Sequence, residues 1–132
     1  MDNFFARSVF FVKDAERSLR YYTETLGSSL EWNHQEQGWA YVFEVSLFGF
    51  QLILNQTQHG TEDRAGHGRL FIGLDDDQIN AFRKHVEEKG FKTAVIEWGA
   101  PTLVILDLDE NELFFGLPES ERASLQAQLA DA

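Results

Sequence analysis

The stretch from Ser8 to Asp14, which reads Ser-Val-Phe-Phe-Val-Lys-Asp, decides the fold. Its apolar and β-branched residues are typical of a buried strand. Asp14 is a favourable N-cap for a helix that ends at Gly27, a residue type well suited to the position after a helix. One face of this helix carries the apolar residues Ala15, Leu19, Tyr22 and Leu26. The sequence therefore predicts a buried strand that runs directly into an amphipathic helix.

The same order returns in the second half of the chain. A strand-like segment covers Arg69 to Leu74, and the acidic run 75–77 then precedes a helix that ends at Gly90. The apolar spacing of the first helix also returns, at Ile79, Phe82 and Val86. We interpret the acidic run as a helix cap, since it lacks the spaced oxygens and the distal Glu of a calcium loop. Two copies of one structural unit are indicated.

Three extended segments follow each predicted helix. They cover residues 29–32, 39–47 and 50–55 in the first half, with a turn expected at 33–38, and residues 91–98, 102–108 and 112–116 in the second half. The repeated βαβββ order predicts one α+β domain over residues 1–132. We expect modules at about 5–55 and 69–117, a polar linker at 56–68 and a C-terminal surface helix at about 120–130. A helix on one face of each mixed sheet leaves the other face open, so the two open faces are expected to enclose a cleft.

The composition limits the partners of this domain. Its 132 residues include 22 acidic and 11 basic ones, so the net charge is −11. Such acidity argues against nucleic acid, whose binding depends on the neutralisation of phosphates. It is compatible with cationic ligands, and equally with a role in solubility alone. Twelve Phe and three Trp exceed what one small core requires, which points to aromatic side chains in a pocket.

The sequence also indicates a cellular compartment. Cysteine is absent, so no disulfide or thiolate chemistry is available. No apolar run approaches the ~20 residues needed to cross a bilayer. Residues 1–7 lack the basic-then-apolar order of a signal peptide. We therefore expect a cytoplasmic protein with no membrane partner.

Several short motifs are spread over the two halves. They are Phe11-Val12-Lys13-Asp14, Ser18-Leu19-Arg20-Tyr21-Tyr22, Leu26-Gly27, Ile72-Gly73-Leu74-Asp75-Asp76, Gly90 and Asp107-Leu108-Asp109-Glu110-Asn111. Together they resemble the vicinal oxygen chelate superfamily of glyoxalases, bleomycin resistance proteins and extradiol dioxygenases. The closing turn departs from that family's Asp-Pro-x-Gly-Asn pattern, with Leu108 and Glu110 in place of proline and glycine. The resemblance implies a ligand cleft and a homodimer, in which the linker is long enough to let modules exchange between chains.

The resemblance also implies where a metal would bind. Metal-using members carry one ligand, usually His or Glu, on the first and last strand of each module. Those positions match Arg7, Gln51, Arg69 and Phe114 in this chain. Guanidinium, carboxamide and phenyl groups do not chelate a divalent cation, and neighbouring strand residues face the other way. We therefore expect no metal and no cofactor, and we expect the four histidines at the surface.

Alternation along the strands predicts which side chains face the cleft. With Arg7 on the open face, the predicted ligand-binding residues are Arg7, Glu44, Gln51, Arg69, Phe71, Trp98, Glu112 and Phe114. Phe71 and Phe114 have packing between the modules as an equal alternative. One point stays open, namely whether the cleft side of strand 39–47 carries Glu44 or the aromatic residues.

Two readings of the arginines follow. Arg7 and Arg69 occupy equivalent places in the two modules, where a pair of guanidinium groups could clamp a carboxylate or phosphate. Alternatively, each arginine only satisfies an acid such as Glu44 or Glu112.

Three functions fit these observations. The leading one is metal-independent binding of an aromatic or charged small molecule, similar to that of the bleomycin resistance proteins, which implies a role in antibiotic resistance. The second is a glyoxalase-like lyase or isomerase, or a dioxygenase, which needs a metal held by other residues or acid–base work by Glu44, Glu97 or Glu112. The third is a regulatory or structural module, favoured by a cleft that aromatic side chains fill.

Overall fold

The computed structural model describes residues 7–36, 39–90 and 93–123, apart from the side chains at 35–36 and 39–40. The first module consists of β1 (Ser8–Val12), α1 (Ala15–Arg20), a π-helical turn (Tyr21–Thr25), β2 (Ser29–Glu36), β3 (Trp39–Leu47) and β4 (Phe50–Gln56). The second consists of β5 (Arg69–Gly73), α2 (Asp76–Lys89), β6 (Ala94–Glu97), β7 (Pro101–Leu106) and β8 (Glu112–Gly116). The predicted βαβββ order is confirmed in both halves.

Each module folds into a four-stranded mixed sheet. The strand orders are β1-β4-β3-β2 and β5-β8-β7-β6. The pairs β1–β4 and β5–β8 are parallel, and the other neighbours are antiparallel. The first and last strands of a module are therefore neighbours, so Arg69 at the start of β5 lies beside Glu112 at the start of β8.

The first sheet extends further than the sequence indicates. Residues 33–36, which were expected in a turn, continue β2, where Asn33 pairs with Phe43 and His34 with Val42. Register shifts at Leu30/Trp32 and at His34/Gln35 interrupt the side-chain alternation that would have revealed a strand. In the second sheet, β6 ends one residue and β7 two residues before the ends that the sequence predicts. The turns that follow these strands set both ends.

The helices begin where their capping residues predict. Asp14 accepts a hydrogen bond from the Arg17 amide at 3.1 Å. Asp75 and Gln78 form a reciprocal capping box, in which each side chain accepts from the other residue's backbone N–H. The acidic run 75–77 is thus a helix start. Residues 119–123 begin the predicted tail helix, while 124–132 lie outside the described residues.

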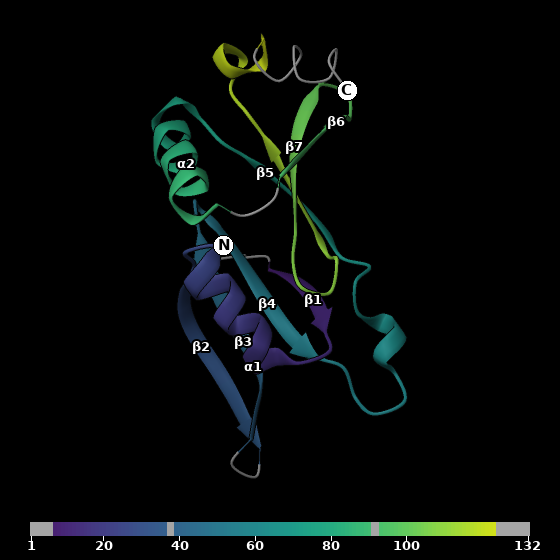
Figure 1. Cartoon of the computed structure of the whole chain (residues 1–132). Coiled ribbons are helices and arrows are strands. Elements are labelled where there is room, and N and C mark those ends of the chain that lie inside the picture. Colours follow the sequence, from purple (N-terminus) through teal and green to yellow (C-terminus); the bar gives the residue numbers. More distant parts are fainter. Residues whose placement is uncertain (1–6, 37–38, 91–92, 124–132) are drawn as a thin grey trace, which may run out of the picture.

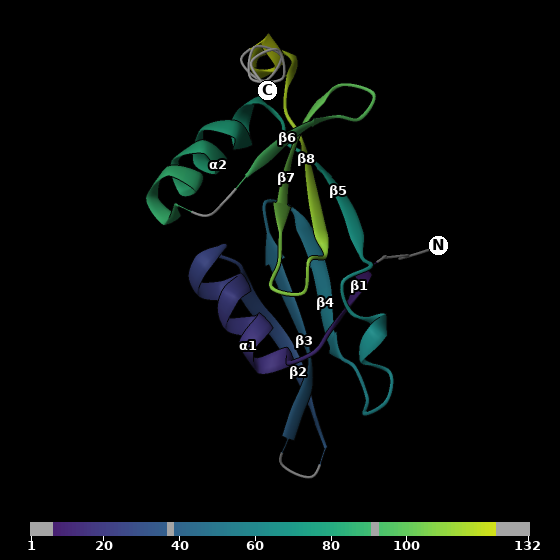
Figure 2. The ribbon, with the colours of Figure 1, turned by 45° about the vertical axis from the view of Figure 1, so that its right-hand side comes forward.

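One hydrophobic core serves both modules. The two helices cover the same side of the paired sheets, as Figures 1 and 2 show. The core between helices and sheets draws on both modules, including Phe10, Tyr22, Leu54, Ile72, Phe82 and Phe115. Because burial of these side chains stabilises both sheets at once, the modules form one unit.

Turns at the two ends of the junction complete the contact between modules. The turn between β7 and β8 lies on the first module, where the Asn111 side chain donates to the Phe11 carbonyl at 3.2 Å. In the opposite direction, Gln78 of α2 donates to the Phe48 carbonyl at 3.2 Å. His85 also belongs to this junction. It is half-buried against Phe48 and Gly27, so the expected surface position of this histidine is wrong.

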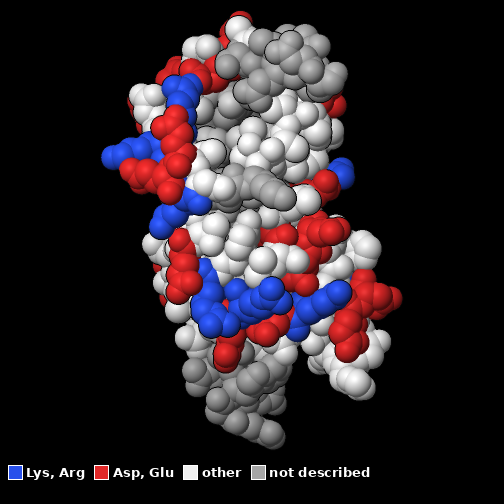
Figure 3. Space-filling model, viewed as in Figure 1, with Lys and Arg blue, Asp and Glu red and all other residues white. Residues whose placement is uncertain are grey.

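The acidity of the chain is not gathered into one patch on the face that carries the helices. Figure 3 shows acidic and basic side chains interspersed over α1 and α2. This mixture is what a role of charge in solubility requires. No helix among the described residues has the length and apolar character that a membrane crossing demands.

Candidate functional site

Each sheet has one face that no helix covers. In β1, Phe10 and Val12 are buried while Val9 is 46% exposed, and in β5, Ile72 is buried while Phe71 is 50% exposed. We call these surfaces the first face (the uncovered side of β1–β4) and the second face (the uncovered side of β5–β8). The first face carries Arg7, Glu44 and Gln51, and the second carries Arg69, Phe71, Glu112 and Phe114, with Trp98 beside them.

The first face carries an ion pair whose carboxylate is buried and whose guanidinium is partly exposed. The Nε atom of Arg7 donates to Oε1 of Glu44 at 2.9 Å, and Glu44 is only 6% exposed. Its strand neighbours Phe43 and Val45 point into the core. The Glu44 side of β3 therefore lies on the uncovered face, which answers the question that the sequence left open. A carboxylate buried to this extent depends on its cation, because desolvation would otherwise make the charge costly.

The second face carries an equivalent but exposed ion pair. Arg69 contacts Oε1 of Glu112 through Nε at 2.8 Å and Nη2 at 2.7 Å. Its guanidinium carbon also lies 4.8 Å from the centre of the Phe114 ring, in cation–π geometry. The side chains of Arg69 and Glu112 are 55% and 33% exposed, so the pair remains accessible. Each arginine thus holds an acid of its own module, as the second reading of the arginines requires.

Three aromatic rings lie next to the exposed ion pair. The ring centres of Phe71 and Trp98 are 5.5 Å apart, and those of Trp98 and Phe114 are 5.3 Å apart. Phe71 lies directly over Gly116, where any side chain would collide with its ring. Phe71 and Trp98 are about half exposed, whereas Phe114 is 2% exposed beneath them. Phe114 supports the cluster, and the other two rings offer aromatic surface to solvent.

A hollow of about 810 Å³ adjoins the second face. It is lined by Tyr21, Thr25, Lys89, Gly90, Thr93, Ala94, Ile96, Val104, Leu106 and Glu112. Sequence reasoning included Glu112 and missed the apolar residues. Val104 and Leu106 pair directly with Phe114 and Glu112, so alternation along β7 is the signal that could have identified them. The hollow has the volume and apolar lining of a pocket for a small organic molecule.

The four metal positions that the resemblance implies do not fit a divalent cation in this chain. Arg7 and Arg69 are engaged with carboxylates, and Phe114 is buried. Gln51 offers one neutral carboxamide oxygen, which cannot hold a metal alone. Among the residues that the structure describes, no three His, Asp or Glu side chains converge. We therefore derive no step through a metal.

A buried polar group fixes the two faces relative to one another. Asp107, in the turn after β7, accepts from the Tyr22 hydroxyl at 2.9 Å and from the backbone and side-chain N–H groups of Asn111. Burial raises the pKa of Asp107 and raises that of Tyr22 well above its usual value. The Tyr22–Asp107 hydrogen bond joins the π-helical turn that follows α1 to the end of β7 in the second sheet. Because both groups lie inside the core, the loss of either one would leave a buried polar group unpaired, which destabilises the fold.

Comparisons with known proteins agree with this architecture. The family model described as the glyoxalase/bleomycin resistance protein/dioxygenase superfamily matches residues 5–113. A glyoxalase/bleomycin resistance protein from Catenulispora acidiphila has a similar structure, with a TM-score of 0.63, 21% identity, and coverage of 86% of this chain and 96% of that one. The comparison with curated protein sequences gives no match.

Two further solved structures show how varied the proteins with this fold are. One is an antibiotic binding protein from Streptomyces, with a TM-score of 0.57, 20% identity, and coverage of 90% of this chain and 100% of that one. The other is a lactoylglutathione lyase from Agrobacterium tumefaciens, with a TM-score of 0.59, 13% identity, and coverage of 88% and 94%. At these identities the likeness concerns the fold. Two tandem βαβββ modules and a family match over most of the sequence lead to one conclusion: the chain belongs to the glyoxalase/bleomycin resistance protein/dioxygenase superfamily.

Proposed function

We propose that this protein binds an aromatic or charged small molecule without a metal, as an antibiotic-binding member of its superfamily. One observation carries the proposal. The four places at which the resemblance to metal-using members would put the ligands are occupied here by two arginines in ion pairs, the neutral Gln51 and a buried phenyl ring. An enzyme that depends on a divalent ion cannot be built from these groups.

The second face supplies the chemistry that such a ligand needs. Phe71 and Trp98 offer half-exposed rings for stacking. The hollow that adjoins this face through Val104, Leu106 and Glu112 is mainly apolar, and Glu112 at its rim, paired with Arg69, can orient a polar or charged substituent. A few polar groups at the edge of an apolar surface are typical of small-molecule sites.

We further propose that the site is completed in a homodimer. Val9 on the first face and Phe71 and Trp98 on the second are each close to half exposed within one chain. Contact between the first face of one copy and the second face of another would bury these side chains and enclose the ligand. Light scattering after gel filtration tests this step, and a monomer at micromolar concentration would contradict it.

The decisive experiment separates binding from metal catalysis. Freshly purified protein is analysed for metals by mass spectrometry and titrated calorimetrically with metal-free bleomycin, before and after treatment with EDTA. We expect less than stoichiometric metal and binding that the treatment does not change. Stoichiometric nickel, zinc, iron or manganese would overturn the proposal and favour a lyase or dioxygenase instead.

Bleomycin resistance in cells provides the second readout. Expression of the protein should raise the minimum inhibitory concentration of bleomycin-type drugs. An unchanged concentration together with no heat of binding would exclude this drug class as the ligand.

A further inference from the structure

A second pocket lies where β1 and β4 end and the chain enters the linker. It has a volume of about 710 Å³ and is lined by Phe11, Tyr41, Asn55, Gln56, Thr57, Gln58, His59, Thr61 and Arg64. Phe11 and Asn55 come from the far end of the first face, and the others come from the edge of β3, the end of β4 and the linker. None of them is among the residues of the second face or of the hollow beside it.

The pocket is unusual for the absence of acids from its lining. The whole chain has twice as many acidic as basic residues, yet none of the nine lining residues is Asp or Glu, and one is Arg64. Two acids, Glu62 and Asp63, precede Arg64 in the linker but do not line the pocket. Glu62 accepts a hydrogen bond from the Gly60 amide at 2.7 Å, and its Oε2 atom lies 3.8 Å from Nδ1 of His59. It is therefore engaged within the linker. Within the lining, Arg64 supplies a positive charge that no lining acid offsets, which favours an anion.

Arg64 is placed to receive that anion. Its guanidinium carbon lies 4.0 Å from the centre of the Phe11 ring, so the planar group stacks on an aromatic face. Arg7, Arg69 and Arg83 each form an ion pair, whereas Arg64 forms none among the described residues. A stacked guanidinium leaves its N–H edge available to bind a carboxylate with two parallel hydrogen bonds.

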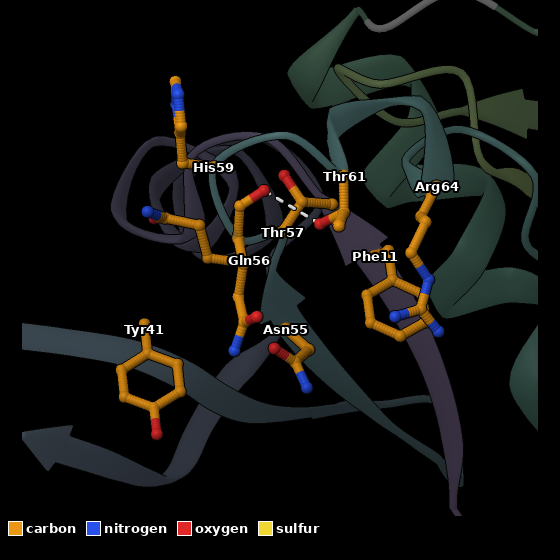
Figure 4. Close-up of a pocket in the computed structure, with 9 residues that line it drawn as sticks. Phe11, Tyr41, Asn55, Gln56, Thr57, His59, Thr61 and Arg64 are labelled. Carbon is orange, nitrogen blue, oxygen red and sulfur yellow. Dashed lines mark hydrogen bonds between the residues drawn. The ribbon is translucent and has the colours of Figure 1, made fainter.

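The remaining walls fit a flat ligand body. Figure 4 shows Tyr41 on one side of the pocket and the Phe11–Arg64 stack on the other, with Asn55 and Gln56 between them. Above them, the Thr57 hydroxyl is buried and has no hydrogen-bond partner among the described residues. A buried hydroxyl without a partner is uncommon in proteins, and a bound polar group is one way to satisfy it.

From these features we infer that the linker pocket is a binding site for planar aromatic carboxylates, with Arg64 as the anion-binding residue. The aromatic part lies between Tyr41 and Phe11, and the carboxylate meets the edge of the Arg64 guanidinium. The side-chain amide of Asn55 is available to a polar substituent of the ring.

A pair of matched probes tests the inference. Naphthalene-2-carboxylate and naphthalene-2-carboxamide have the same planar body and differ in charge. Each is titrated into the isotope-labelled full-length chain and followed by two-dimensional amide NMR. We expect the carboxylate to bind about tenfold more tightly than the carboxamide and to shift amides within residues 55–64.

Two variants identify the anion-binding residue. Arg64→Ala should weaken binding of the carboxylate about tenfold and change binding of the carboxamide less than about twofold. Arg20→Ala, which removes an exposed arginine outside the pocket, is the matched control and should change neither. Because Arg64 is exposed, its removal leaves the fold intact, and the dispersion of the same spectra verifies this.

Three outcomes would overturn the inference. They are equal affinity for both probes, unchanged affinity in Arg64→Ala, and shifts confined to Arg69, Phe71 and Trp98. The last outcome would assign the carboxylate to the second face, and it would leave the bleomycin experiment intact. The two proposals therefore fail separately.

Discussion

The two uncovered faces carry the same kind of ion pair at equivalent places, but in opposite environments. On the first face Glu44 is almost fully buried and takes its partner from the start of β1. On the second face Arg69 is exposed and Glu112 partly exposed, and the half-exposed rings of Phe71 and Trp98 lie on the same face. The repeated βαβββ module thus places one Arg–Glu pair on each uncovered face, in two different environments. We propose that the first pair serves stability and that the second takes part in recognition.

The largest expected effect comes from removal of the half-buried cation that pairs with buried Glu44. Arg7→Met leaves Glu44 buried without its partner, and we expect the free energy of unfolding to fall by about 3 kcal/mol. The matched change Arg69→Met, which breaks the exposed pair, should cost less than about 1 kcal/mol. Urea unfolding followed by circular dichroism measures both. Equal losses would contradict the division between a structural and a recognition face. Recovery in the double variant Arg7→Met/Glu44→Gln would identify the unpaired charge as the cause.

A smaller loss is expected at the junction that holds the two faces side by side. Tyr22→Phe removes the hydroxyl that donates to Asp107 at 2.9 Å and leaves the rest of the ring in the core. The buried carboxylate then lacks one donor, so the free energy of unfolding should fall by about 1–3 kcal/mol. Tyr21→Phe is the control, since its hydroxyl donates to the Leu106 carbonyl at the exposed end of the junction. Unchanged stability in Tyr22→Phe would show that water replaces the donor.

For ligand affinity, in contrast to stability, we expect substitutions on the second face to have the larger effect. Trp98→Ala removes a half-exposed ring that contacts both Phe71 and Phe114. We expect affinity for metal-free bleomycin to fall by about 1 kcal/mol, roughly fivefold, with little change in stability. Val9→Ala on the first face should change the affinity less. Calorimetric titration measures both variants, and a larger effect for Val9→Ala would transfer recognition to the first face.

Patterns among residues close in the sequence predicted much of this fold. The features that were missed depend on contacts between residues far apart in the sequence. The caps at Asp14 and Asp75 could be predicted because a helix start depends on residues within one turn. The end of β2 could not, because Asn33 and His34 are polar and become strand residues only by pairing with β3. The same limit applies to the candidate site. Side-chain alternation along the strands placed Glu44 and Glu112 on the same faces as the arginines, and pairing with them was one of the two interpretations. Nothing in the sequence indicated that Glu44 is buried while the second pair is more exposed. Pockets assembled from the linker and several strands were missed, since their residues meet only in the folded chain.

The smallest expected effect concerns pH and the carboxyl group between the modules. Burial raises the pKa of Asp107 above its ordinary value of 3.8, although Asn111, Tyr22 and the Asp109 amide donate hydrogen bonds to it. Between pH 3.8 and the raised value, the folded protein retains a proton that the unfolded chain has lost. The unfolded state then binds fewer protons, so this group makes the free energy of unfolding fall as the pH rises through that window.

Asp107→Asn removes this titration and keeps the shape of the side chain. Urea unfolding of both proteins across a pH series gives the stability of the wild type minus that of the variant. We expect this difference to decrease as the pH rises from 3.8 and to become constant once Asp107 is ionised in the folded state. A difference that increases with pH would mean that the donated hydrogen bonds outweigh burial. The junction would then be held by a stabilised carboxylate, and both faces would be fixed most firmly at neutral pH.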